Sequence, residues 1–188
     1  ILLGEHGVVY GRHALALPIP DGVKVTVTRA SELSHDLPGE FVDLLLNELG
    51  VDDRGWRISI DSQLPFGKGL GSSAAIAVAV ARAFNNALQL GLDDEGVNAI
   101  AFASEKLAHG TPSGVDNTLA TFSRPMLFRN AGGLQFESLG IDTPPPLIVA
   151  WGHETGRTTE QVAGVRKRRE QSLAHFDYLF DEMDRLSQ

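Results

Sequence analysis

The sequence contains no cysteine in its 188 residues. Disulfide bridges, zinc–thiolate centres and cysteine nucleophiles are therefore excluded. The sequence also lacks a long hydrophobic run, since no apolar stretch reaches the roughly 18 residues that a membrane-spanning helix needs. We therefore expect a soluble chain without a membrane partner.

Basic residues are also scarce, with 16 Lys and Arg against 24 Asp and Glu, which gives a formal net charge of -8. Proteins that bind nucleic acids usually present a basic surface, so this balance argues against a nucleic-acid partner. A few local hydrogen-bond donors can still bind an anionic ligand. The hydrophobic content of 43% is typical of a globular chain.

The periodicity of apolar residues predicts a mixture of strands and helices. Residues 23–30 alternate apolar and polar side chains, as in a half-buried strand, and 72–91 predict a buried, alanine-rich helix closed by Gly91. Because the elements show no regular βαβ alternation, the sequence favours the α+β class. The basic run Arg166–Arg169 is predicted to be a solvated helix face. The remaining predictions are helices over 39–50, 93–110 and 159–186 and strands over 56–64 and, buried, 146–152.

A glycine-rich loop, PFGKGLGSSAA (Pro65–Ala75), lies between a predicted strand and a predicted helix. Glycine has no Cβ, so the alternating glycines let the backbone approach a ligand closely. Exposed N–H groups and the positive end of a helix dipole both attract phosphate at such a position. Ser72 and Ser73 lie where the helix starts, so one can cap it and the other can offer a hydroxyl to phosphate or Mg²⁺.

Two well-known phosphate-binding patterns do not fit this loop. A P-loop requires a lysine directly after its last glycine, whereas Lys68 lies inside the loop. A dinucleotide-binding fingerprint requires a third glycine where the sequence has Ser72. By itself, the loop therefore fits either a phosphate cradle or a plain glycine-rich connection with a capping serine.

Two carboxylates further along the chain favour the phosphate interpretation. The segment SEKLAHGTPSGVDN places Glu105 on a predicted helix, at the flank of its apolar face, and Asp116 in a turn-like stretch. Phosphoryl transfer from ATP to an alcohol needs donors that bind the phosphates, hard oxygen ligands for Mg²⁺ and a carboxylate near the accepting hydroxyl. Ser73, Glu105 and Asp116 together supply one group for each need.

Three segments, GEHGVVYG, PFGKGLGSSAA and HGTPSGVDN, resemble signature segments of the GHMP kinases. The first and third are similar to the mevalonate kinase branch of that superfamily, as is TTEQVAGVR, so the resemblance runs from Gly4 to about Arg166. It implies ATP- and Mg²⁺-dependent phosphorylation of the 5-hydroxyl of mevalonate to 5-phosphomevalonate, in isoprenoid precursor synthesis. It also implies a GHMP kinase N-terminal domain over 1–145 and the start of a C-terminal domain over 146–188.

The resemblance assigns roles residue by residue. Asp116 is implied to be the catalytic aspartate that accepts or orients the proton of the substrate hydroxyl, and Ser73 and Glu105 are implied to bind Mg²⁺. The residues implied to contact mevalonate are Glu5, His6 and Thr158. The residues implied to bind the ATP phosphates are Pro65, Gly67, Lys68, Gly69, Leu70, Gly71, Ser72, Ser73 and Ala74.

Two parts of the family pattern are not in these 188 residues, a lysine in a P-G-K segment ahead of the first motif and a glycine-rich third motif. We therefore expect a segment of a longer enzyme that turns over poorly by itself. Two other interpretations stay open: another GHMP kinase that acts on phosphomevalonate, homoserine or a sugar, and a non-catalytic nucleotide-binding module. For the whole protein we expect a cytoplasmic location and a homodimer.

Overall fold

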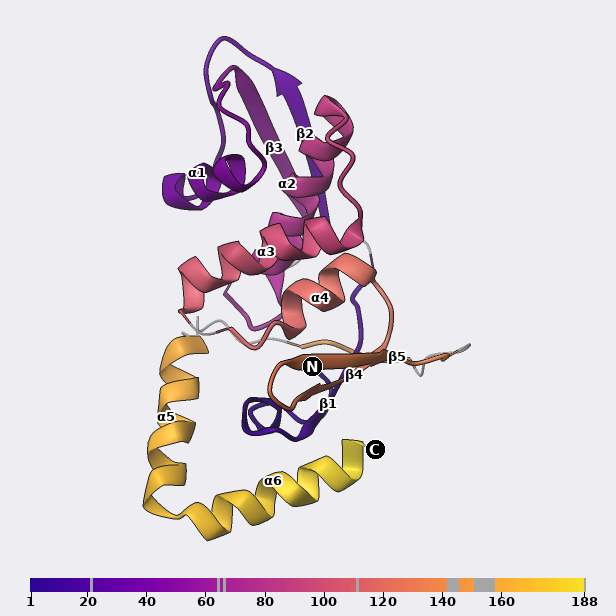
Figure 1. The fold of residues 1–188 in the computed structure, drawn as a ribbon, viewed down its shortest axis with the longest axis vertical. Helices are drawn as coiled ribbons and strands as arrows, with labels where there is room; N and C mark the ends of the chain where they lie inside the picture. The colour runs from indigo at the N-terminus through magenta and orange to yellow at the C-terminus, as the bar shows by residue number, and fades with distance from the viewer. Residues whose placement is uncertain are drawn as a thin grey trace. The chain divides into compact units, whose positions relative to one another are not determined.

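The computed structural model describes residues 1–20, 22–63, 65, 67–110, 112–141, 146–150 and 158–187. The chain divides into two compact units, whose elements are labelled in Figure 1. The helical unit comprises Ile19–Phe66 and Leu70–Phe122, and the sheet unit comprises Ile1–Pro18, Gly67–Gly69 and Ser123–Gln188. The combination of helices with antiparallel sheets confirms the predicted α+β class.

The helical unit is built on an antiparallel strand pair, β2 (Val23–Arg29) and β3 (Trp56–Ser62), in which Arg29 lies opposite Trp56. Its helices are α1 (Gly39–Glu48), α2 (Ser72–Leu88), α3 (Asp94–His109) and α4 (Val115–Phe122). Because α2 packs against β2, α3 and α4, it forms the centre of this unit (Figure 1).

The core of the helical unit lies between α2 and the inner face of the strand pair. Alternate strand residues face the helices, which is why Trp56 and Ile58 are buried while Arg57 between them is exposed. Trp56 meets Phe84 of α2 edge to face, with the ring centroids 5.3 Å apart. Eight of the 17 residues of α2 are buried and only Asn86 and Ala87 are exposed, so the prediction of a buried helix is confirmed.

The sequence predicted the start of α3 better than the end of α2. The Asp93 side chain accepts a hydrogen bond from the Gly96 N–H at 2.9 Å and caps α3, so the helix begins where the prediction over 93–110 placed its start. α2 ends earlier than predicted, because Gln89 rather than Gly91 caps it, in a left-handed conformation with φ of 54°. The Asn85 side chain holds this turn by two hydrogen bonds to the backbone of Leu92.

The sheet unit contains strands that the periodicity did not predict. β1 (His13–Ala16), β4 (Met126–Asn130) and β5 (Leu134–Ser138) form an antiparallel sheet in the order β1-β4-β5. These strands are only 4 or 5 residues long, so their alternation does not stand out from the flanking sequence. The helical elements of this unit are the 3-10 helix η1 (Gly7–Tyr10), α5 (Thr158–Gln171) and α6 (Leu173–Ser187).

The buried strand predicted over 146–152 is wrong. Its described part, 146–150, belongs to no strand and is exposed, with Ile148 97% accessible. The last two residues of the prediction lie outside the described ranges. An apolar run becomes a buried strand only where a neighbouring strand pairs with it and other elements cover it, and the run by itself does not reveal either.

The segment 159–186, predicted to be mostly helical, forms two helices, α5 and α6, that are separated at Ser172. The break lets Arg169 and Asp177 form an ion pair of 2.8 Å, whereas a continuous helix would hold these residues about 12 Å apart along its axis. Arg169 is half-buried, whereas Arg166, Lys167 and Arg168 are exposed, so the predicted solvated face is confirmed for three of the four basic residues. Neither of these helices, nor any other helix within the described ranges, combines the length and apolarity needed to cross a bilayer.

Candidate active site

The N-terminus of α2 forms the end of the glycine-rich loop. Gly71 occupies the N-cap position with φ of 69°, and its carbonyl oxygen accepts the Ala75 N–H at 3.0 Å. Neither Ser72 nor Ser73 caps the helix, which corrects the prediction, since both lie within its first turn. The N–H groups of a first turn have no partner inside the helix, so they point out of its end, where an anion can bind.

Gly71 lies directly against Asp116. A Cβ atom on Gly71 would be 3.6 Å from both Cβ and Cγ of Asp116 and 3.8 Å from its Oδ1 atom. Asp116 belongs to the first turn of α4, which corrects the turn-like conformation predicted for it. The starts of α2 and α4 therefore meet, and the last glycine of the loop lies beside the predicted catalytic carboxylate.

Hydrogen bonds hold the start of α4 on α3. The side-chain amides of Asn98 and Asn117 form a hydrogen bond of 2.6 Å, and Asn98 also donates to the Thr118 hydroxyl at 3.5 Å. Asn117 and Thr118 are buried, whereas Asp116 is half-buried. Since successive helix residues point in different directions, anchoring these two against α3 leaves Asp116 directed elsewhere, toward Gly71. The sequence analysis missed Asn98, whose signal is its place two turns before Glu105 on α3.

Glu105 lies on α3 and is 5% exposed, so it is more buried than its predicted place at the flank of the apolar face suggested. Its neighbour Ser104 is also buried and donates a hydrogen bond to the Ala101 carbonyl oxygen at 2.7 Å. α3 packs against both α2 and α4, the helices whose starts meet at Gly71. A buried carboxylate is a hard oxygen donor whose charge water screens little, which makes Glu105 a candidate ligand for a cation.

The donor chemistry of the helical unit fits Mg²⁺. The Glu105 carboxylate and the Ser73 hydroxyl are hard oxygen donors of the kind that Mg²⁺ prefers. Within the described ranges, no group of three or more His, Asp or Glu side chains is placed to hold a metal ion. Mg²⁺ that is bound with substrate phosphates is commonly held by one or two protein ligands together with water.

The other predicted site residues belong to the sheet unit. Glu5 is exposed and His6 is half-buried, in a turn ahead of η1 where His6 has a positive φ of 63°. The predicted ATP contacts Gly67–Gly69 are also in this unit. Thr158 begins α5, and its side chain lies outside the described residues. The helical unit holds the remaining ones, Pro65, 70–74, Glu105 and Asp116.

Comparison with known proteins decides the family. Residues 36–124 match the family model of the GHMP kinases N terminal domain. Over its whole length the chain is 30% identical to a mevalonate kinase of Archaeoglobus fulgidus and covers 67% of that protein. The chain belongs to the GHMP kinase family. The family expected from the three sequence motifs is therefore confirmed.

Other relatives of this GHMP kinase chain are also named mevalonate kinase. A mevalonate kinase of Pyrococcus furiosus is 33% identical over 91% of the chain, which covers 60% of that protein. The crystal structure of L. major mevalonate kinase in complex with R-mevalonate is 30% identical, with a TM-score of 0.77 over 98% of the chain and 63% of the solved protein. The chain thus spans about 60% to 67% of the length of these relatives.

Proposed function

We propose that the full-length protein transfers the γ-phosphoryl group of ATP to the 5-hydroxyl of mevalonate. The observation that carries the proposal is the contact between Gly71 and Asp116, which lies 3.6 Å from a Cβ position on that glycine. This contact places a loop that can bind phosphate next to a carboxylate that can accept the proton of an alcohol. Relatives named mevalonate kinase, at 30% and 33% identity, support mevalonate as the alcohol.

In this mechanism the chain mainly positions groups and compensates charge. N–H groups at the starts of α2 and α4 attract the triphosphate, and both helix dipoles direct their positive ends toward it. The hydroxyl oxygen of mevalonate attacks the γ-phosphorus while the bond to the oxygen that bridges the β- and γ-phosphates breaks, and ADP leaves. Asp116 orients the hydroxyl and accepts its proton as the new bond forms.

Ser73 and Glu105 would hold the Mg²⁺ ion in this proposal. When bound, the ion neutralises charge on the phosphate oxygens that develops during transfer. The burial of Glu105, at 5% exposure, strengthens its attraction for a cation because water screens it little.

The proposal is tested by a coupled ADP-release assay of the full-length protein with four alcohols: mevalonate, phosphomevalonate, homoserine and galactose. We expect kcat/KM for mevalonate to exceed that for each of the others by at least about 100-fold, since a site built for one alcohol leaves polar groups unsatisfied with another. A preference for another alcohol would assign a different GHMP kinase activity. Magnesium-dependent ATP binding without transfer to any alcohol would identify a nucleotide-binding module instead.

Gly71→Ala tests the contact itself. The variant places a methyl group against Asp116 and forces alanine into φ of 69°, at a cost of about 1–2 kcal/mol in stability. We expect kcat to fall about tenfold to 100-fold, because small displacements of a reacting group are costly to the rate. Steady-state kinetics and thermal unfolding measure the two effects.

Gly91→Ala is the matched control for this variant. Gly91 follows the other end of α2 with φ of 72°, and no described atom lies within 4 Å of its Cβ position. It should lose similar stability and keep the wild-type kcat. If the two variants were equally active, the contact between Gly71 and Asp116 would have no part in the reaction.

A further inference from the structure

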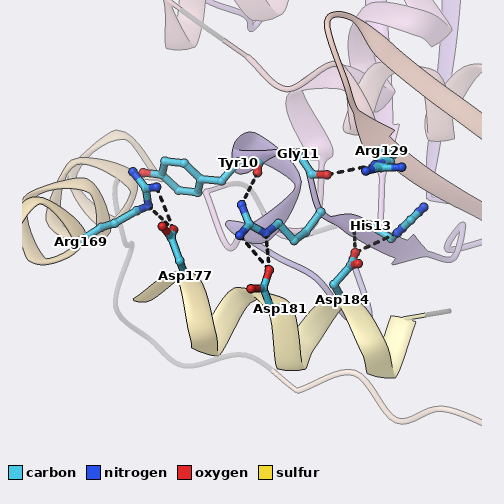
Figure 2. A network of polar contacts seen from close by, with 9 residues as sticks. Tyr10, Gly11, His13, Arg129, Arg169, Asp177, Asp181 and Asp184 are labelled. Carbon is cyan, nitrogen blue, oxygen red and sulfur yellow. Dashed lines mark hydrogen bonds and ion pairs between the residues drawn. The ribbon is translucent and has the colours of Figure 1, made fainter. Parts of the chain in front are cut away.

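Helix α6 carries three aspartates on one face, each of which contacts an Arg or His side chain elsewhere in the sheet unit (Figure 2). Their spacings of four and three residues bring them to the same side of the helix. The pairs are Asp177 with Arg169, Asp181 with Arg12, and Asp184 with His13, each at 2.8 Å. The pairs of Asp181 and Asp184 connect α6 to Arg12 and to His13, the first residue of β1.

Of these two interactions, the one of Asp184 with His13 is less exposed and includes a backbone hydrogen bond. Its Oδ1 atom accepts the backbone N–H of His13 and also lies 2.8 Å from the Nδ1 atom of that residue. The two side chains are 24% and 20% exposed, whereas Asp181 in the neighbouring pair is 65% exposed. Exposed ion pairs contribute little. The hydrogen bond to the backbone of β1 therefore makes Asp184 the residue through which α6 acts on this segment.

His13 in turn supports the turn that contains Glu5 and His6. Gly4 packs so closely on β1 that a Cβ atom there would lie 2.1 Å from the His13 carbonyl oxygen. The Gly7 N–H donates to the Glu5 carbonyl oxygen at 2.8 Å and closes the turn. The positive φ of His6, 63°, is strained for a residue with a side chain and persists only where the surroundings impose it.

Apolar contacts of α6 reach the same segment. The rings of Phe180 and Tyr10 stack with their centroids 5.0 Å apart. On the neighbouring helix α5, the guanidinium of Arg169 lies 4.5 Å from the Tyr10 centroid. Further along α6, Met183 and Leu186 line a cavity of about 230 Å³ together with the chain from Leu2 to Glu5. Residues of α6 thus contact the chain on both sides of the Glu5–His6 turn, from Leu2 to His13.

We infer that α6 positions the Glu5–His6 turn for the substrate, with Asp184 as the positioning residue that acts through His13 and Gly4. The inference rests on the proposed function and on the prediction from the sequence that Glu5 and His6 contact mevalonate. Asp184 itself touches no reacting atom. It therefore governs the affinity for the alcohol and leaves the affinity for ATP unchanged.

Three variants of the full-length enzyme test this role. Asp184→Ala removes both contacts to His13, and we expect it to raise the KM for mevalonate at least about tenfold without changing the KM for ATP. Asp184→Asn keeps an oxygen for the His13 N–H and should stay near the wild type. Glu182→Ala is the control on the same helix, because it removes only the exposed pair with Arg185 at 3.0 Å.

Amide hydrogen exchange gives a second readout that needs no activity. The N–H groups of Gly7 and Val8, bonded to Glu5 and Gly4, should exchange faster in Asp184→Ala, with the helical unit unchanged. An unchanged KM for mevalonate, or equal rises in both KM values, would overturn the inference. If the wild type does not phosphorylate mevalonate, the proposed function fails, and the exchange rates alone decide whether Asp184 holds the turn.

Discussion

Asp116→Asn is expected to lower the kcat for phosphoryl transfer to mevalonate by at least about 100-fold in the full-length enzyme. Asparagine has the size of aspartate and keeps the contact with Gly71, but its amide cannot accept the proton of the hydroxyl group. The loop and α2 are unaltered, so ATP should bind as it does to the wild type. Single-turnover transfer and calorimetric ATP binding measure the two effects separately.

Asp94→Asn is the matched control for the catalytic variant. Asp94 also lies in the first turn of a helix, α3, and forms an ion pair with Arg82 at 2.8 Å. Both substitutions remove a negative charge near a helix N-terminus, which costs about 0.3–1 kcal/mol of stability. Only Asp116→Asn should abolish transfer. Turnover near the wild-type rate in Asp116→Asn would remove the catalytic role assigned to this carboxylate.

Glu105→Gln is expected to raise the Mg²⁺ concentration needed for half-maximal activity by about 10- to 100-fold. The amide keeps the shape of the carboxylate but lacks the charge that a buried cation ligand supplies. If Glu105 binds Mg²⁺, added Mg²⁺ should also stabilise this variant less than it stabilises the wild type. Magnesium titrations of activity, with thermal unfolding in the presence and absence of Mg²⁺, measure both effects.

Glu95→Gln makes the same chemical change on the same helix. Glu95 lies in the first turn of α3 and is exposed, so its loss should leave the magnesium dependence unchanged. An identical magnesium requirement in Glu105→Gln and Glu95→Gln would show that Glu105 is buried for structural reasons alone. The donor at Ser73 would then need another protein partner.

Local patterns predicted the helical unit well because its elements are long and strongly periodic. The spacing of apolar residues along the chain predicted β2, α1, β3, α2 and α3, because each of these elements buries one face. The short strands of the sheet unit were missed, and the run at 146–150 was misread, because pairing and cover come from distant segments. The division at 145, the cytoplasmic location and the homodimer stay predictions.

The sequence by itself determined the family, the glycine-rich loop ahead of α2 and the residue types that a phosphotransferase needs. These features are local, since glycine freedom, helix starts and side-chain chemistry are properties of short stretches. Only the tertiary structure decided that Gly71 lies beside Asp116 and that Asp184 accepts a hydrogen bond from His13. Both contacts join segments far apart in the chain. They depend on how the helices pack, as in the hydrogen bond between Asn98 and Asn117, and the spacing of residues along one helix does not reveal such partners.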